Sequence, residues 1–124
     1  MYSQEVKIEL ADGREKDYFG QSVDIFENNM IIGAPRREVP GKPRDSGVAL
    51  IYERNTKTGV WELKANLTAS DSVLDGGFGT AVAISNQVAV VGAPDMRSVY
   101  FFRKGLNGWA QETKYTMPDW VRSF

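Results

Sequence analysis

The 124-residue sequence contains neither cysteine nor histidine. Without cysteine there is no disulfide framework, no thiol nucleophile and no thiolate metal site. Without histidine there is no Ser-His-Asp or Cys-His catalysis and no imidazole zinc site. A glycosidase-type carboxylate pair would still be available, but no motif in the sequence indicates one. We therefore expect that the protein is not an enzyme.

Long apolar runs are also missing. No stretch approaches the roughly 20 apolar residues of a membrane helix, so no membrane insertion is expected. The first ten residues, MYSQEVKIEL, have neither the basic start nor the apolar core of a signal peptide. The chain is expected to be either cytoplasmic or a mature segment whose leader is missing. A net charge of −1 argues against a nucleic acid partner.

The main positive feature of the sequence is an internal repeat. Residues Phe19–Pro35, FGQSVDIFENNMIIGAP, recur as Phe78–Pro94, FGTAVAISNQVAVVGAP, and the differences 78 − 19 and 94 − 35 both equal 59. The composition, 42% hydrophobic and 25% charged, is that of an ordinary folded domain. A repeat of this length indicates stacked supersecondary units.

Each unit predicts four short strands, because apolar and β-branched runs alternate with polar turns. In the first two strands both faces are apolar and are expected to be covered, whereas the fourth strand is mixed and is expected to be an outer, partly solvated one. The predicted strands are Ser22–Phe26, Met30–Gly33, Val48–Arg54 and Trp61–Thr68, then Ala81–Ser85, Val88–Ala93, Val99–Arg103 and Trp109–Thr116.

Four-stranded units covered on both faces are typical of β-propeller blades. We therefore predict an all-β fold with two four-stranded antiparallel blades of a partial propeller. Residues Tyr2–Ile8 align with Trp61–Leu67 at the same spacing and are predicted to be the outer strand of a preceding blade. The expected division is residues 1–18 for that strand and its link, 19–77 for the first blade and 78–124 for the second.

The two repeated half-motifs resemble a known family. Phe19-Gly20 with Gly33-Ala34-Pro35, and their second copies at 78–79 and 92–94, are similar to FG-GAP repeats. The resemblance covers nearly the whole chain. It implies an integrin-α-like propeller of an extracellular or cell-surface protein.

The motif residues also have a physical interpretation of their own. A Phe at the start of the first strand can fill the space between neighbouring blades. Gly permits a close backbone approach, and Pro ends a strand because it has no amide donor. These residues are therefore expected to be architectural.

Two blades are fewer than the roughly 4–8 of a propeller, so we expect the chain to have neighbours. We favour a segment of a longer propeller, with self-assembly of several copies second and a small open stack third. The expected partners are therefore other blades of the same propeller or copies of this chain.

The candidate binding surface is one rim of the blades. In an up-and-down blade the loops after the second strand and the links between blades lie on the same rim, where binding residues concentrate on a rigid scaffold. An ordinary solvated rim is the alternative. The candidates for binding a protein or glycan ligand are Arg36, Arg37, Lys42, Arg44, Asp45, Asp95, Arg97 and Trp120.

The resemblance also raises the question of calcium, because many integrin-type repeats carry an Asp-x-Asp-x-Asp-Gly loop between the two half-motifs. The matching positions here, 27–29 and 86–87, are short and poor in carboxylates. No cofactor is therefore expected, and calcium has only weak candidates in Asp71 and Asp75, which also suit turn or capping roles. Asn66-Leu67-Thr68 fits the N-glycosylation pattern and makes Asn66 a candidate acceptor.

These observations favour a non-catalytic protein-interaction or adhesion module outside the cell or on its surface. One alternative is a structural subunit of a filament or coat. A second alternative is a carbohydrate-binding or carbohydrate-active domain.

Overall fold

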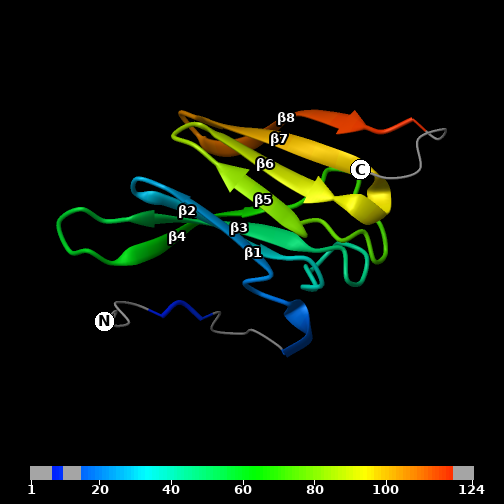
Figure 1. Ribbon diagram of the computed structural model, residues 1–124, viewed down its shortest axis with the longest axis horizontal. Coiled ribbons are helices and arrows are strands. Elements are labelled where there is room, and N and C mark those ends of the chain that lie inside the picture. The colour runs from blue at the N-terminus through cyan, green and yellow to red at the C-terminus, as the bar shows by residue number, and fades with distance from the viewer. Residues whose placement is uncertain (1–6, 10–14, 119–124) are drawn as a thin grey trace, which may run out of the picture.

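The computed structural model describes residues 7–9 and 15–118, which form eight strands and two short 3-10 turns. The strands make two four-stranded antiparallel sheets, as predicted (Figure 1). In chain order the elements are η1 (Glu15–Asp17), β1 (Ser22–Phe26), β2 (Asn29–Ala34), β3 (Val48–Arg54), β4 (Trp61–Leu67), β5 (Ala81–Ile84), β6 (Val88–Ala93), η2 (Pro94–Met96), β7 (Ser98–Gly105) and β8 (Gly108–Thr116).

Each repeat unit forms one sheet whose strands pair in sequence order, so we call β1–β4 the first blade and β5–β8 the second. Tight polar turns favour this order because they return each strand beside the one before it. The pairing registers of the two blades agree closely. Both sheets also carry one irregularity at the same place, between Ile51 and Tyr52 and between Phe101 and Phe102.

The register defines equivalent positions in the two blades. Gly33 pairs with Ala49, as Gly92 pairs with Val99. In the same way, the pair of Ile31 with Ile51 matches the pair of Val90 with Phe101, and the pair of Ala49 with Leu67 matches the pair of Val99 with Tyr115.

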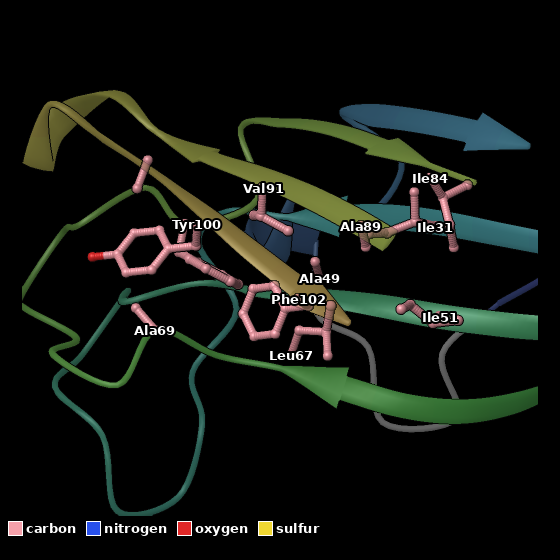
Figure 2. Packing of buried hydrophobic residues seen from close by; sticks show 12 residues of the cluster. Ile31, Ala49, Ile51, Leu67, Ala69, Ile84, Ala89, Val91, Tyr100 and Phe102 are labelled. Carbon is pink, nitrogen blue, oxygen red and sulfur yellow. The ribbon is translucent and has the colours of Figure 1, made fainter. Parts of the chain in front are cut away.

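The two blades stack face to face and enclose the larger apolar core. On the first blade, the face toward the second carries Ile31, Ala49, Ile51 and Leu67, and we call it the trailing face. On the second blade, the opposing leading face carries Ile84, Ala89, Val91, Tyr100 and Phe102. Figure 2 shows the rings of Tyr100 and Phe102 pointing from β7 toward the first blade.

A smaller core lies on the leading face of the first blade, which points away from the second. It contains Ile32, Ala34, Val48, Leu50 and Tyr52. Ile8 and Val39 pack against it, and residues 7–9 run along this side of the blade in Figure 1. The chain therefore covers part of this face with two segments that lie outside the sheet.

One expectation about burial was wrong. Both faces of the first two strands were predicted to be covered, and β2 is largely buried, but Val23 and Ile25 of β1 are 57% and 55% exposed. Val23 pairs with Ile32 and so lies on the leading face. Because β1 is the edge strand, it lies beyond the cover that Ile8 and Val39 provide over the smaller core.

Part of the predicted outer strand at Tyr2–Ile8 lies outside the described residues, and residues 7–9 form no strand. Ile8 nevertheless packs on the leading face of the first blade. Leu67, its equivalent 59 positions later, packs in the same way on the leading face of the second blade. The division of the chain at residues 18 and 77 stays a prediction.

Candidate functional site: the blade junction and the loop rims

The repeated Phe is central to the blade junction. Phe78 is fully buried, and its ring meets those of Tyr100 and Phe102 edge to face, with centroids 5.3 and 6.0 Å apart. Its backbone nitrogen donates to the carbonyl oxygen of Ser46 at 3.3 Å. Aromatic pairs in this geometry stabilise a core beyond the area that they bury. Phe78 therefore fills the space between the blades, as predicted.

Two glycines of the first blade let the second blade approach. A Cβ atom on Gly33 would lie 1.9 Å from the carbonyl oxygen of Gly79, and one on Gly47 would lie 2.1 Å from that of Phe78. No side chain fits at such distances, so the Phe-Gly backbone rests directly on β2 and on the start of β3. The importance of Gly33 was predicted from its motif. Gly47 was missed because it lies outside the repeated half-motifs.

Two polar side chains of β1 fasten the junction. The Ser22 hydroxyl donates to the carbonyl oxygen of Gly79 at 3.0 Å. The backbone N–H of Ile84 donates to the Asp24 carboxylate at 2.9 Å, although the two residues are 60 positions apart. Farther out, Lys104 pairs with Glu53 at 3.1 Å across the blades. Sequence reasoning did not single out these contacts, because nothing local indicates which polar strand residue has a partner in the next sheet.

Asp71 belongs to the link between the blades and serves the junction. Its carboxylate accepts a hydrogen bond from the Tyr100 hydroxyl at 2.7 Å and forms an ion pair with Lys114. Burial raises the pKa of Tyr100 well above its ordinary value, and the bond to Asp71 adds to this effect. Partial burial acts to raise the pKa of Asp71, but the hydrogen bonds from Lys114 and Tyr100 outweigh it and hold that pKa below its ordinary value.

The long loop between β2 and β3 is bound to the segment that precedes the first blade. Arg37 donates to the Asp17 carboxylate at 2.9 Å, and the side chains of this pair are only 18% and 5% exposed. Arg37 also lines a cleft of about 620 Å³ with Lys42, Arg44 and Asn66. The structure thus brings three of the predicted rim residues together but gives Arg37 a structural contact. Asn66 is exposed on β4, an edge strand.

A second cleft of about 150 Å³ collects other predicted rim residues. It is lined by Arg36, Asp45, Asp75 and Asp95 among others. The Arg36 guanidinium lies 5.4 Å from the centre of the Tyr18 ring.

Arg97 is not among the residues that line this cleft. Arg97 donates to the carbonyl oxygen of Pro118 at 3.5 Å. Trp120 lies outside the described residues. The seven predicted rim residues that the structure describes therefore do not form one continuous site.

The residues present do not fit the calcium site that the family often carries. The turns between the first two strands of each blade are short, with Phe26 pairing with Asn29 and Ser85 bonding to Val88. Calcium takes about six to eight oxygen ligands. In the part of the chain that the structure describes, no group of three or more Asp or Glu residues is placed to hold a metal ion. The two weak candidates lie in different surroundings, Asp71 against Tyr100 and Asp75 in the small cleft.

A polar groove on the opposite rim was not predicted. It measures about 950 Å³ and lies between the hairpin turns of the two blades, where Asn28, Gln87, Glu53 and Lys104 are among its lining residues. Asn28 and Gln87 are 59 positions apart and occupy the same turn in the two blades. The repeat itself could have indicated this groove, because equivalent turns of stacked blades share one rim.

Comparison with known proteins agrees with this geometry. Curated proteins give no match to the chain. Within residues 7–9 and 15–118, no helix has the length and apolar character of a membrane span. The sequence profile of the FG-GAP repeat matches residues 2–52 and 61–102, and in the structure the two half-motifs that name this repeat meet at the blade junction. The chain therefore belongs to the FG-GAP repeat family.

Proposed function

We propose that this chain is a non-catalytic protein-interaction module that acts in adhesion or recognition outside the cell or at its surface. FG-GAP repeats are typical of integrin-α-like extracellular modules. The polar groups at the junction support a structural role, because Ser22, Asp24 and Asp71 are engaged in holding the blades together.

One observation carries the proposal, namely the uncovered trailing face of the second blade. The apolar residues of this face are Ala81, Ala83, Val90, Val99, Phe101 and Tyr115, and Thr113 lies beside Phe101. The equivalent positions of the first blade, Ile31, Ala49, Ile51 and Leu67, are between 0% and 4% exposed. Tyr115, in contrast, is 57% exposed. A continuous apolar face of this kind marks a contact site for another protein.

The expected partner is another β-sheet, either a further blade of the same propeller or a copy of this chain. An apolar sheet face is buried best by a second sheet, at a spacing of about 10 Å. The clefts with Arg36, Lys42 and Arg44 provide a second, polar contact area on the loop rim.

A role as a filament or coat subunit is the second candidate. It needs partners on both ends of the stack, and the exposure of Val23 and Ile25 on the leading face favours it. A carbohydrate-binding role is supported only by the polar groove between the hairpin turns.

A photo-reactive amino acid tests the interaction role. p-Benzoylphenylalanine at position 115 would be compared with the same residue at position 106, because Leu106 is fully exposed at the tip of the β7–β8 hairpin. In a surface extract of the source organism, covalent protein adducts are expected from position 115 and not from position 106. Equal yields from the two positions would refute the proposal.

A further inference from the structure

We infer that the polar groove between the hairpin turns of the two blades binds a neutral, hydroxyl-rich oligosaccharide. The hairpin turns of both blades gather at one end of the stack, at the left in Figure 1, and line a groove of about 950 Å³. Each blade supplies one wall of this groove, so no neighbouring blade is needed to form it. Sugar binding here would be a further activity, separate from the protein contact proposed for the trailing face.

Carboxamide side chains are concentrated in the turns that line the groove. Asn28 belongs to the β1–β2 turn and Asn29 begins β2, while Asn86 and Gln87 form the β5–β6 turn. Within residues 7–9 and 15–118, none of these four amide groups makes a side-chain hydrogen bond. Each carboxamide offers two donors and one acceptor oxygen. Unpaired groups of this kind on two walls suit a ligand that both donates and accepts hydrogen bonds.

The conformation of the turns does not explain these amides. Asparagine is common in hairpin turns because it tolerates a positive φ angle, or because its side chain bonds to the backbone that follows. In the β1–β2 turn the positive φ of 53° belongs to Glu27, and none of the three amide-bearing turn residues has a positive φ. Asn55 shows the structural use, since its Oδ1 accepts from the Lys57 backbone N–H at 2.9 Å. The unpaired amides serve neither purpose.

The same backbone contact holds both turns in place. The backbone N–H of Arg54 donates to the carbonyl oxygen of Asn28, and that of Lys104 donates to the carbonyl oxygen of Gln87, each at 2.8 Å. Arg54 and Lys104 occupy equivalent positions in the two blades, as the strand registers show. The amides therefore belong to turns whose backbone is already fixed, which lowers the entropic cost of binding a ligand.

The charged residues of the groove favour a ligand without net charge. Glu53 pairs with Lys104 across the blades at 3.1 Å, and Glu62 pairs with Lys64 at 3.3 Å. The lining residues carry three carboxylates and four cations, so neither sign dominates the surface. A polyanion such as a nucleic acid binds through many cationic contacts, which this mixed surface does not offer.

The groove has few apolar contacts, and this disfavours a peptide as its occupant. Among the described residues that line it, Leu106 is the only one with an apolar side chain, and none is aromatic. Protein interfaces depend on buried aromatic and aliphatic anchors. Sugar hydroxyls, in contrast, both donate and accept hydrogen bonds, as carboxamides do. Because the affinity rests on hydrogen bonds alone, we expect a dissociation constant of about 1 mM.

Titration of the full chain with neutral oligosaccharides, followed by heteronuclear NMR of the side-chain amides, tests this inference. The probes are mixtures of cello-, manno- and galacto-oligosaccharides at millimolar concentrations. The amide signals of Asn28 and Gln87 should shift along a saturating curve. Those of Gln21, an exposed amide on the opposite rim, should not move. Unshifted signals of Asn28 and Gln87 with every probe would overturn the inference.

Two double variants identify the contacts. Asn28→Ala with Gln87→Ala should raise the dissociation constant at least about fivefold, because two hydrogen-bonding groups are lost. Asn28→Asp with Gln87→Glu preserves the shape of both side chains but removes their donors, and it should weaken binding as well. Gln21→Ala, the matched change on the opposite rim, should leave the constant unchanged. An unchanged constant in both double variants would contradict the assigned site.

Two other results would also overturn sugar binding in this groove. Shifts with dextran sulfate and with no neutral probe would mean that the groove binds anions through its lysines. Protein adducts from a photo-reactive residue at position 106, which lines the groove, would mean that a polypeptide occupies it. Failure of sugar binding leaves the contact proposed for Tyr115 intact, because Tyr115 does not line this groove.

Discussion

Gly33 of the first blade lies against the carbonyl oxygen of Gly79, so closely that a Cβ atom at position 33 would be 1.9 Å from it. The amide of Gly79 in turn donates to Gly92 of its own blade at 3.1 Å. The Phe-Gly half-motif therefore contacts Gly-Ala-Pro segments on both sides, one in its own blade and one in the blade before. This double contact explains why both half-motifs recur together at one spacing.

The two equivalent glycines, Gly33 and Gly92, should respond differently to substitution. Gly33→Ala is expected to destabilise the protein by about 2–4 kcal/mol, because the added methyl group collides with backbone at the junction. Gly92→Ala should change stability by less than about 1 kcal/mol, since the nearest atom to the new Cβ is 3.4 Å away. Urea unfolding of both variants tests this, and equal losses would contradict the close contact at Gly33.

The carboxylate of Asp24 should be important as a hydrogen-bond acceptor. Asp24→Ala leaves the buried N–H of Ile84 without its partner, and the expected cost is about 1–3 kcal/mol. Asp24→Asn keeps an acceptor oxygen and should cost clearly less. The free energies of unfolding can be compared by urea denaturation, and an Ala variant as stable as the wild type would show that this bond does not contribute.

Adjacent arginines of the long loop should differ in their effects on stability. Arg37→Ala breaks a largely buried ion pair with Asp17 and is expected to cost about 2–4 kcal/mol. Arg36→Ala removes only a contact with the Tyr18 ring and should cost less than about 1 kcal/mol. Thermal unfolding would measure both. Equal unfolding temperatures of the two variants would show that the ion pair of Arg37 with Asp17 does not stabilise the protein.

Asp71 makes stability depend on acidity. Its pKa in the folded protein lies below the ordinary value of 3.8, so its contribution is complete above that pH and is lost as the pH falls through the lowered folded value. Because Asp71 and Lys114 are partly exposed, the contribution should be below about 1 kcal/mol. Asp71→Asn should therefore flatten the dependence of unfolding free energy on pH below about 4. An unchanged slope would contradict this assignment.

Calcium should have no effect on the stability of this chain. The short turns at 27–29 and 86–87 carry a single carboxylate, that of Glu27, which is far fewer oxygen ligands than a calcium loop supplies. The unfolding temperature is expected to be the same in excess calcium and in EDTA. Calcium-dependent stabilisation would refute this expectation, and its loss in Asp71→Asn or Asp75→Asn would identify the ligand.

Much of the fold could be predicted because its causes are local. The repeat at 59 positions, the β-branched runs and the polar turns determine eight strands that pair in sequence order within each unit. The burial of Phe78 and the need for Gly33 also followed from the motif. The roles of the predicted rim residues could not be read from the sequence in the same way. The loop between β2 and β3 folds back, and Arg37 forms an ion pair with Asp17 there.

The sequence by itself determined the two blades and their strand order, since hairpins and alternating side chains are specified within a few neighbouring residues. Only the tertiary structure decided which surfaces meet. The stacking of the sheets brings Asp24 to Ile84 and Gly47 to Phe78, and it leaves Tyr115 uncovered where Leu67 is buried. These contacts depend on how two separately formed sheets are oriented, and no local pattern encodes that orientation.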